Sequence, residues 1–194
     1  PDVLIFVNGL PLVFIELKNE TVKVQEAFTK NLTDYKKIIP NIFAFNQICV
    51  LSNGRETRIG AFNADYEFFF QWLKATNEKE KINRKQIFED GISIEIFADG
   101  LLKKETLLDY IENFILFDNQ KTKIIAKNHQ FLGVNNLFRQ MHKREELKGK
   151  LGVFWHTQGS GKSYSMVMFA RKVMRKIVGN FSFLVVTDRD DLDT

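Results

Sequence analysis

Cysteine is almost absent from this sequence of 194 residues, which contains one, Cys49. A single cysteine cannot form an intramolecular disulfide, and it cannot by itself supply the ligands of a zinc site. Because Cys49 lies inside the apolar run ICVL, we interpret it as a core residue of a protein from a reducing cytoplasm. A disulfide-stabilised scaffold is therefore excluded.

Long hydrophobic runs are also missing. No apolar stretch approaches the roughly 18 residues that a membrane-spanning helix needs, and no signal peptide is recognisable. Internal repeats and low-complexity tracts are absent as well. We therefore expect a cytoplasmic protein without a membrane partner.

What the chain does contain is typical of a globular protein with a slight excess of positive charge. Apolar residues make up 44% of the chain and include 19 phenylalanines, which favours a well-filled core. The net charge of +4 permits a nucleic-acid partner without requiring one. The chain starts at Pro1 without a methionine and ends just after a strand-like run, so we expect it to be part of a longer protein.

The first part of the sequence predicts strands and helices in a mixed order. Short apolar runs bounded by turn residues predict strands over 3–7, 12–17, 47–53 and 56–62. Apolar residues at three- and four-residue steps predict helices over 21–39, about 84–97 and 104–116. Pro40 should end the first helix. Residues 66–75 are aromatic and fit either a helix or a strand.

The second part predicts a βαβ unit of a parallel sheet. A polar connection over 118–130 is followed by predicted elements in the order helix, strand, helix and strand, at 131–147, 151–156, 164–178 and 181–187.

The stretch TQGSGKS, between the strand and the helix of this unit, is the most specific motif of the sequence. Gly159 and Gly161 allow the backbone to curl around a phosphate, and the next helix points its positive end at the same place. We expect Lys162 to reach the β- and γ-phosphates of ATP and the Ser163 hydroxyl to coordinate Mg²⁺. His156 stands where G-x-x-x-x-G-K-[ST] has its first glycine. The candidate ATP-binding residues of this phosphate loop are Thr157, Gln158, Gly159, Ser160, Gly161, Lys162 and Ser163.

The stretch PDVLIFVNGLPLVFIELKN at the start of the chain predicts two strands around Asn-Gly with three ionisable groups at their ends. Phosphodiester hydrolysis needs a divalent metal, an activated water and neutralisation of the phosphate charge. The carboxylates of Asp2 and Glu16 can hold Mg²⁺, which prefers oxygen ligands. Lys18 shares a strand face with Glu16 and can orient or deprotonate the water. The alternative is a hairpin with charged ends.

This catalytic interpretation requires a particular strand register. A two-residue turn at Asn8-Gly9 pairs residue 7 with residue 10, and then Asp2 faces Ile15 and points away from Glu16. A three-residue loop or a bulge shifts the register by one residue and places Asp2 on the face of Glu16. The same holds if Asp2 lies outside the regular strand. We therefore expect something other than a simple two-residue turn.

A nuclease-like start followed by a helicase-type phosphate loop resembles the restriction (R) subunit of type I restriction–modification enzymes. The resemblance covers the whole chain and is carried by PDVLIFVNGLPLVFIELKN, FWHTQGSGKS and VVTDRDDL. It implies an α/β protein with two domains, both truncated. Residues 1–118 would form a PD-(D/E)xK nuclease-like mixed sheet flanked by helices. Residues 119–194 would form the first βαβ part of a RecA-like motor domain of the superfamily 2 helicase type.

The resemblance also assigns roles to residues of the nuclease part. Asp2, Glu16 and Lys18 match its catalytic motif, and the backbone carbonyl of Leu17 joins the two carboxylates as a metal ligand. The segment NLTDY matches a Gln-x-x-x-Tyr element near the active site. It has Tyr35 in place and Asn31 where glutamine is usual.

Two further elements match the motor part of the family. Asn-His-Gln at 128–130 resembles its His-Gln element, which makes Gln130 the candidate for adenine recognition. Thr187, Asp188 and Arg189 match the motif after the second strand, which lies near the DNA track in helicase-type motors.

The resemblance implies an ATP-dependent type I site-specific deoxyribonuclease from a bacterium or archaeon, with ATP and Mg²⁺ as cofactors. Its partners would be double-stranded DNA and the modification (methyltransferase) and specificity subunits. The chain alone should not hydrolyse ATP, because it lacks the acidic motif, the arginine finger and the second motor lobe. Two alternatives stay open: a helicase-type ATPase with a structural N-terminal domain, and a docking module for partner subunits.

Overall fold

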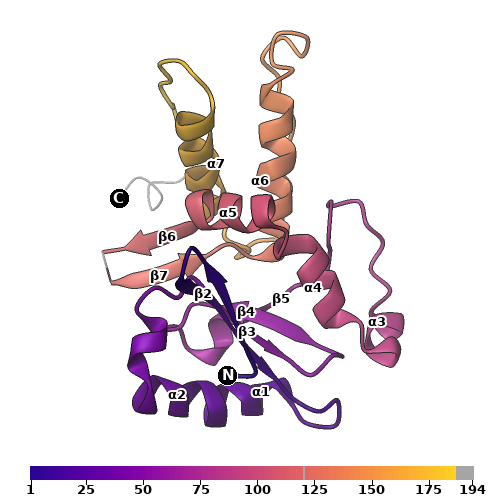
Figure 1. Ribbon diagram of the computed structural model, residues 1–194. Coiled ribbons are helices and arrows are strands. Elements are labelled where there is room, and N and C mark those ends of the chain that lie inside the picture. The colour runs from indigo at the N-terminus through magenta and orange to yellow at the C-terminus, as the bar shows by residue number, and fades with distance from the viewer. Residues whose placement is uncertain (120, 187–194) are drawn as a thin grey trace.

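A five-stranded mixed sheet organises the first part of the chain (Figure 1). The computed structural model describes residues 1–119 and 121–186. The strands, which lie in sequence order in the sheet, are β1 (Val3–Val7), β2 (Leu10–Leu17), β3 (Ile48–Ser52), β4 (Thr57–Gly60) and β5 (Phe70–Gln71). β2 and β3 are parallel, and the other neighbours are antiparallel. The predicted mixed α/β class is confirmed.

One face of the sheet is covered by a helical segment of three successive parts. These are α1 (Val24–Glu26), the π-helix η1 (Ala27–Leu32) and α2 (Thr33–Ile38), and the 3-10 turn η2 (Pro40–Phe43) follows. The segment ends just before Pro40, as the sequence predicts. Its apolar side chains pack on those of β2 and β3 in a buried cluster of Phe14, Val24, Ala27, Leu32, Phe43, Cys49, Leu51 and Phe69. Cys49 is fully buried, as expected, and burial raises the pKa of its thiol to about 12.

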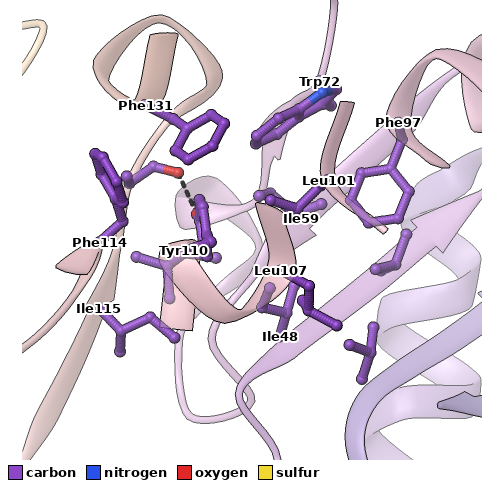
Figure 2. Close-up of a cluster of buried hydrophobic side chains, with 14 of the residues drawn as sticks. Ile48, Ile59, Trp72, Phe97, Leu101, Leu107, Tyr110, Phe114, Ile115 and Phe131 are labelled. Atoms are coloured by element: carbon purple, nitrogen blue, oxygen red, sulfur yellow. Dashed lines mark hydrogen bonds between the residues drawn. The ribbon is translucent and has the colours of Figure 1, made fainter. Parts of the chain in front are cut away.

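The opposite face packs against α4 (Ser93–Leu101) and α5 (Lys104–Asn113), and Figure 2 shows the aromatic side chains of this core. The ring of Phe131 lies 4.8–5.8 Å, centroid to centroid, from those of Trp72, Tyr110 and Phe114. The Tyr110 hydroxyl donates a hydrogen bond to the Ala126 carbonyl, which satisfies its polar end inside the core.

Two predicted elements differ from the structure for local reasons. The helix predicted over 84–97 is divided into α3 (Arg84–Asp90) and α4, because Gly91 adopts a left-handed φ of 67° that ends α3. Residues 66–75, for which the sequence left two options, contain the 3-10 turn η3 (Tyr66–Phe68) and β5.

The polar connection predicted over 118–130 contains a hairpin instead. β6 (Ile115–Asp118) pairs with β7 (Thr122–Ile125), with the ends Ile115 and Ile125 buried in the core. Charged side chains on the hairpin hid its apolar contacts from the sequence pattern. The predicted domain boundary at 118/119 falls in the turn of this hairpin and remains a prediction.

The last two helices, α6 (Asn128–Met141) and α7 (Lys162–Lys176), lie side by side (Figure 1). α6 begins three residues earlier than predicted, because the Gln130 side chain accepts a hydrogen bond from the Lys127 N–H and caps the helix. α7 corresponds to the predicted helix over 164–178. Each helix within the described residues is too short or too polar to cross a lipid bilayer.

The prediction of strands over 151–156 and 181–187 is wrong for the residues that the structure describes, and residue 187 lies outside them. Residues 151–157 and 181–186 are irregular in the described part of the chain, and Val153, Trp155 and Leu184 are 86–90% exposed. An apolar segment becomes a strand only when a neighbouring strand takes up its backbone hydrogen bonds. Within the described residues no strand pairs with either segment, and α7 packs mainly on α6 and α5, so the βαβ unit is represented by its helix.

Replacing Gly60 with alanine should destabilise the sheet. A Cβ at this position of β4 would lie 2.5 Å from the Cδ2 atom of Phe69, whose side chain is fully buried. We expect the free energy of unfolding to fall by about 1–3 kcal/mol, measured by urea denaturation. In a Phe69→Leu background the cost of Gly60→Ala should shrink. An equal cost in both backgrounds would contradict the proposed clash.

Candidate functional site

The hairpin of β1 and β2 combines a two-residue turn with a bulge. Asn8 and Gly9 have positive φ angles of 52° and 80°, and the pairs next to the turn are Val7↔Leu10 and Phe6↔Pro11. The register then shifts between Ile5 and Phe6, so the next pair is Ile5↔Val13 and Leu12 is the extra residue of β2.

The bulge decides which residues face each other at the open end of the hairpin. The shifted register continues through Val3↔Ile15, so Asp2 comes opposite Glu16 and on the same face of the sheet. The turn itself has two residues, and the bulge, one of the two arrangements that the sequence analysis named for bringing Asp2 onto the face of Glu16, is present.

The three ionisable groups of the opening stretch lie together in this arrangement. The Asp2 Oδ2 atom accepts a hydrogen bond of 2.6 Å from the Leu17 N–H, and the Lys18 ammonium donates one of 2.8 Å to Glu16 Oε1. Asp2 is exposed, whereas the side chain of Glu16 is 3% exposed. Asp2 and Glu16 therefore lie opposite each other at the open end of the hairpin, and Lys18 is paired with Glu16.

The second carboxylate oxygen of Glu16, Oε2, is buried, and within the described residues no hydrogen bond reaches it. A buried, unpaired carboxylate oxygen is costly, because it has lost its water without gaining a donor. A cation bound beside it would remove this cost. The described residues contain no group of three or more histidine, cysteine or acidic side chains suited to a metal, so a metal here would rely on two carboxylates and backbone oxygen.

The helical segment η1–α2 places the two other predicted site residues over the same face of the sheet. The Tyr35 ring packs edge-on against Phe14 with centroids 5.7 Å apart, and Phe14 precedes Glu16 by two residues on β2. Asn31 lies one turn earlier, in the π-helix, where the Thr33 N–H reaches the Phe28 carbonyl five residues back. Tyr35 thus shares the face of Glu16, although its contact is with Phe14 and not with a carboxylate.

The phosphate loop precedes α7 as predicted. Gly159 and Gly161 have φ angles of 74° and 86°, which only glycine adopts without strain. The Lys162 ammonium donates to the carbonyls of His156 and Thr157, at 2.9 and 3.0 Å, so the lysine folds back over its own loop. Ser163 is exposed in the first turn of α7, next to the positive end of the helix.

Gln130 touches the phosphate loop directly. Its Nε2 atom donates a hydrogen bond of 2.8 Å to the Gly161 carbonyl, and its Oε1 atom accepts one from the Lys127 N–H. The preceding residue His129 places its Nε2 atom 3.2 Å from the Ser160 carbonyl, and burial lowers the pKa of this histidine. Both the oxygen and the nitrogen of the Gln130 amide therefore form hydrogen bonds within the chain. The sequence analysis had assigned this amide to the recognition of adenine.

Sequence reasoning missed the contacts that fix α7. The Lys172 ammonium is bound by both carboxylate oxygens of Asp109 on α5, at 2.7 and 2.6 Å, and by Asn135 Oδ1 on α6 at 2.5 Å. Burial lowers the pKa of Lys172, and the hydrogen bond with Asp109 opposes this shift. Lys176 pairs with Glu112 nearer the surface. The two Arg-Lys pairs of α7 could have indicated ion pairs with neighbouring helices, but such a pattern is more often found on a solvent-exposed helix face.

Part of the sequence-based site lies outside the described residues. Thr187, Asp188 and Arg189, which match the motif after the second predicted strand, are among them.

Comparison with known proteins adds independent information. Residues 1–68 match the family described as type I restriction enzyme R protein N terminus, and residues 129–194 match the SWI2/SNF2 ATPase family. The whole chain is 41% identical to the type I restriction enzyme HindI endonuclease subunit of Haemophilus influenzae, of which it covers 19%. It is 30% identical over its whole length to a type I restriction enzyme endonuclease subunit of Staphylococcus aureus, of which it covers 20%.

Residues 1–68 thus match the R protein N terminus, and the whole chain is similar to endonuclease subunits of type I restriction enzymes. The resemblance inferred from the opening hairpin and the phosphate loop is therefore confirmed. Since the chain spans about a fifth of the length of the curated relatives it matches, the R protein match describes this region and not a whole enzyme.

Proposed function

We propose that this region of an R protein contains the DNA-cleaving site of a type I restriction enzyme and the phosphate-binding part of its ATP site. The observation that carries the cleavage proposal is the buried Glu16 Oε2 atom, which no donor reaches in the part of the chain that the structure describes. It lies on the sheet face that Asp2 and Lys18 also occupy. A hairpin whose charged ends were merely solvated would not bury a carboxylate oxygen without a donor.

The donor set of this site fits Mg²⁺, a hard cation that prefers oxygen ligands. The carboxylates of Asp2 and Glu16 would hold it, together with the backbone carbonyl of Leu17. When bound, the ion supplies Lewis-acid stabilisation of the phosphate and lowers the pKa of a bound water.

Lys18 has a defined role beside these carboxylates. Its ammonium is held 2.8 Å from Glu16 Oε1 and its side chain is 20% exposed, so it can still reach a phosphate from solvent. The positive charge neutralises the negative charge that develops on the phosphate, and the N–H groups can orient the attacking water. Tyr35 and Asn31 complete the proposed site from the helix that covers this face. The PD-(D/E)xK type of nuclease core is part of this proposal.

The phosphate loop serves the motor function in this proposal. Residues 157–163 would bind the phosphates of ATP, with Lys162 on the β- and γ-phosphates and Ser163 on Mg²⁺. Gln130 would contribute to this ATP site from beside the loop, where it is hydrogen-bonded to the Gly161 carbonyl. ATP hydrolysis in the complete R subunit would then move double-stranded DNA through an assembly with modification and specificity subunits. The mild positive charge fits contacts to the DNA backbone without base reading.

Manganese binding tests the cleavage site directly. Mn²⁺ should bind the complete R subunit, and Glu16→Gln should weaken this binding by about tenfold or more, because a neutral amide is a poorer ligand for a hard cation. Titration calorimetry and anomalous scattering from Mn²⁺-soaked crystals measure affinity and position. Ser163→Ala removes the metal ligand proposed at the phosphate loop and controls for metal bound there. If no Mn²⁺ binds near Glu16, the N-terminal region is structural or serves as a docking module.

A further inference from the structure

Helix α6 holds two consecutive carbonyl groups of the phosphate loop from one side. Gln130 Nε2 donates to the Gly161 carbonyl at 2.8 Å and lies 3.4 Å from the Ser160 carbonyl, and His129 Nε2 lies 3.2 Å from the same Ser160 oxygen. Gln130 is only 3% exposed. Because its Oε1 atom accepts from the Lys127 N–H, the amide is oriented with its nitrogen toward the loop.

Holding these carbonyls determines where the loop points its N–H groups. In a trans peptide the C=O and N–H bonds point in opposite directions. The Ser160 carbonyl shares a peptide with the Gly161 N–H, and the Gly161 carbonyl shares one with the Lys162 N–H. With both oxygens turned to α6, both N–H groups turn away from it. They belong to the start of α7, where N–H groups have no partner within the helix.

Gly161 is needed for this contact as well as for its backbone angle. A Cβ at this position would lie 2.6 Å from Gln130 Nε2, too close for the hydrogen bond to form. The φ of 86° and the approach of Gln130 therefore both require glycine at this position.

We propose that Gln130 is a positioning residue for the phosphate loop, which it keeps in the conformation that presents the Gly161 and Lys162 N–H groups to a polyphosphate. This inference rests on the proposed function, in which the loop binds a nucleoside triphosphate. It differs from adenine recognition in a measurable way. A residue that orients the loop affects every ligand with a polyphosphate group equally, whereas a residue that recognises adenine affects ATP alone.

The variant Gln130→Glu separates the two ends of the side chain. A glutamate retains an oxygen that can accept from the Lys127 N–H, so α6 stays capped. The glutamate replaces the N–H donor with a second oxygen that faces the loop carbonyls.

The affinity of the complete R subunit carrying this substitution is measured for ATP, GTP and inorganic tripolyphosphate by titration calorimetry. Gln140→Glu, near the other end of α6, is the matched control for the change of charge.

We expect Gln130→Glu to weaken all three ligands by the same factor, about tenfold, through the loss of one hydrogen bond and the repulsion of the facing oxygens. Circular dichroism and a melting temperature above the assay temperature should show that the variant is folded. A loss confined to ATP, or unchanged affinity for all three ligands, would overturn the positioning role. If the wild-type protein binds none of them, the proposed phosphate site is refuted and this inference with it.

Discussion

Replacing Glu16 with glutamine should abolish DNA cleavage by the complete enzyme and leave its ATP hydrolysis unchanged. The substitution keeps the shape of the side chain and removes the charge that would hold the metal. We expect the cleavage rate to fall at least about 100-fold, because the stabilisation supplied by a bound metal amounts to several kcal/mol. The two activities are measured on the same preparation, with plasmid DNA for cleavage and phosphate release for ATP hydrolysis.

The burial of Glu16 makes this result informative. The substitution replaces a buried carboxylate, of which one oxygen has no donor within the described residues, with a neutral amide whose oxygen can still accept from Lys18, so the fold should not suffer. Glu20→Gln is the matched control, since this carboxylate lies just beyond β2 and is 58% exposed. Lys18→Met should reproduce the loss of cleavage. Unchanged cleavage in both Glu16→Gln and Lys18→Met would show that the nuclease lies elsewhere and that this hairpin is structural.

Replacing Lys172 with methionine should have the largest effect on stability. The substitution leaves Asp109, whose side chain is 23% exposed, without its cation, and we expect a cost of about 3 kcal/mol, the lower end of the range for breaking a buried ion pair. We expect a corresponding fall in the free energy of unfolding, measured by urea denaturation.

The same helix provides the control for this prediction. Lys176→Met removes the same type of side chain from an ion pair whose partners are 40% and 41% exposed, which should cost at most about 1 kcal/mol. Combining Lys172→Met with Asp109→Leu should recover most of the lost stability, because no unpaired charge then remains. Equal costs for Lys172→Met and Lys176→Met would show that the buried pair contributes no more than the surface pair.

The sheet and its first covering helix could be predicted because their patterns are local. β3 and the helical segment up to Ile38 follow from apolar periodicity and from Pro40, which depend on neighbouring residues in the sequence. The β6–β7 hairpin could not be found in this way. Its Ile115 and Ile125 are buried by contacts with distant helices, and the charged residues between them suggested a loop.

The candidate sites show the same limit. Asp2, Glu16 and Lys18 could be named from their chemistry, but the bulge at Leu12 that brings them together has no sequence signal of its own. The Gln130 contact with Gly161 and the Lys172 contact with Asp109 join residues far apart in the chain. The pattern of one helix does not reveal which of its polar side chains meets a partner from another.

Whether Asp2 and Glu16 lie on the same face of the sheet depends on whether the number of residues between them is odd or even. Because side chains alternate between the two faces of a strand, gaining or losing one residue there moves one carboxylate to the other face, and gaining or losing two restores the pairing. Deleting Leu12 alone should thus separate the two acids without changing any ionisable residue. Natural variation in the length of this hairpin should therefore proceed in steps of two wherever the acidic pair is retained.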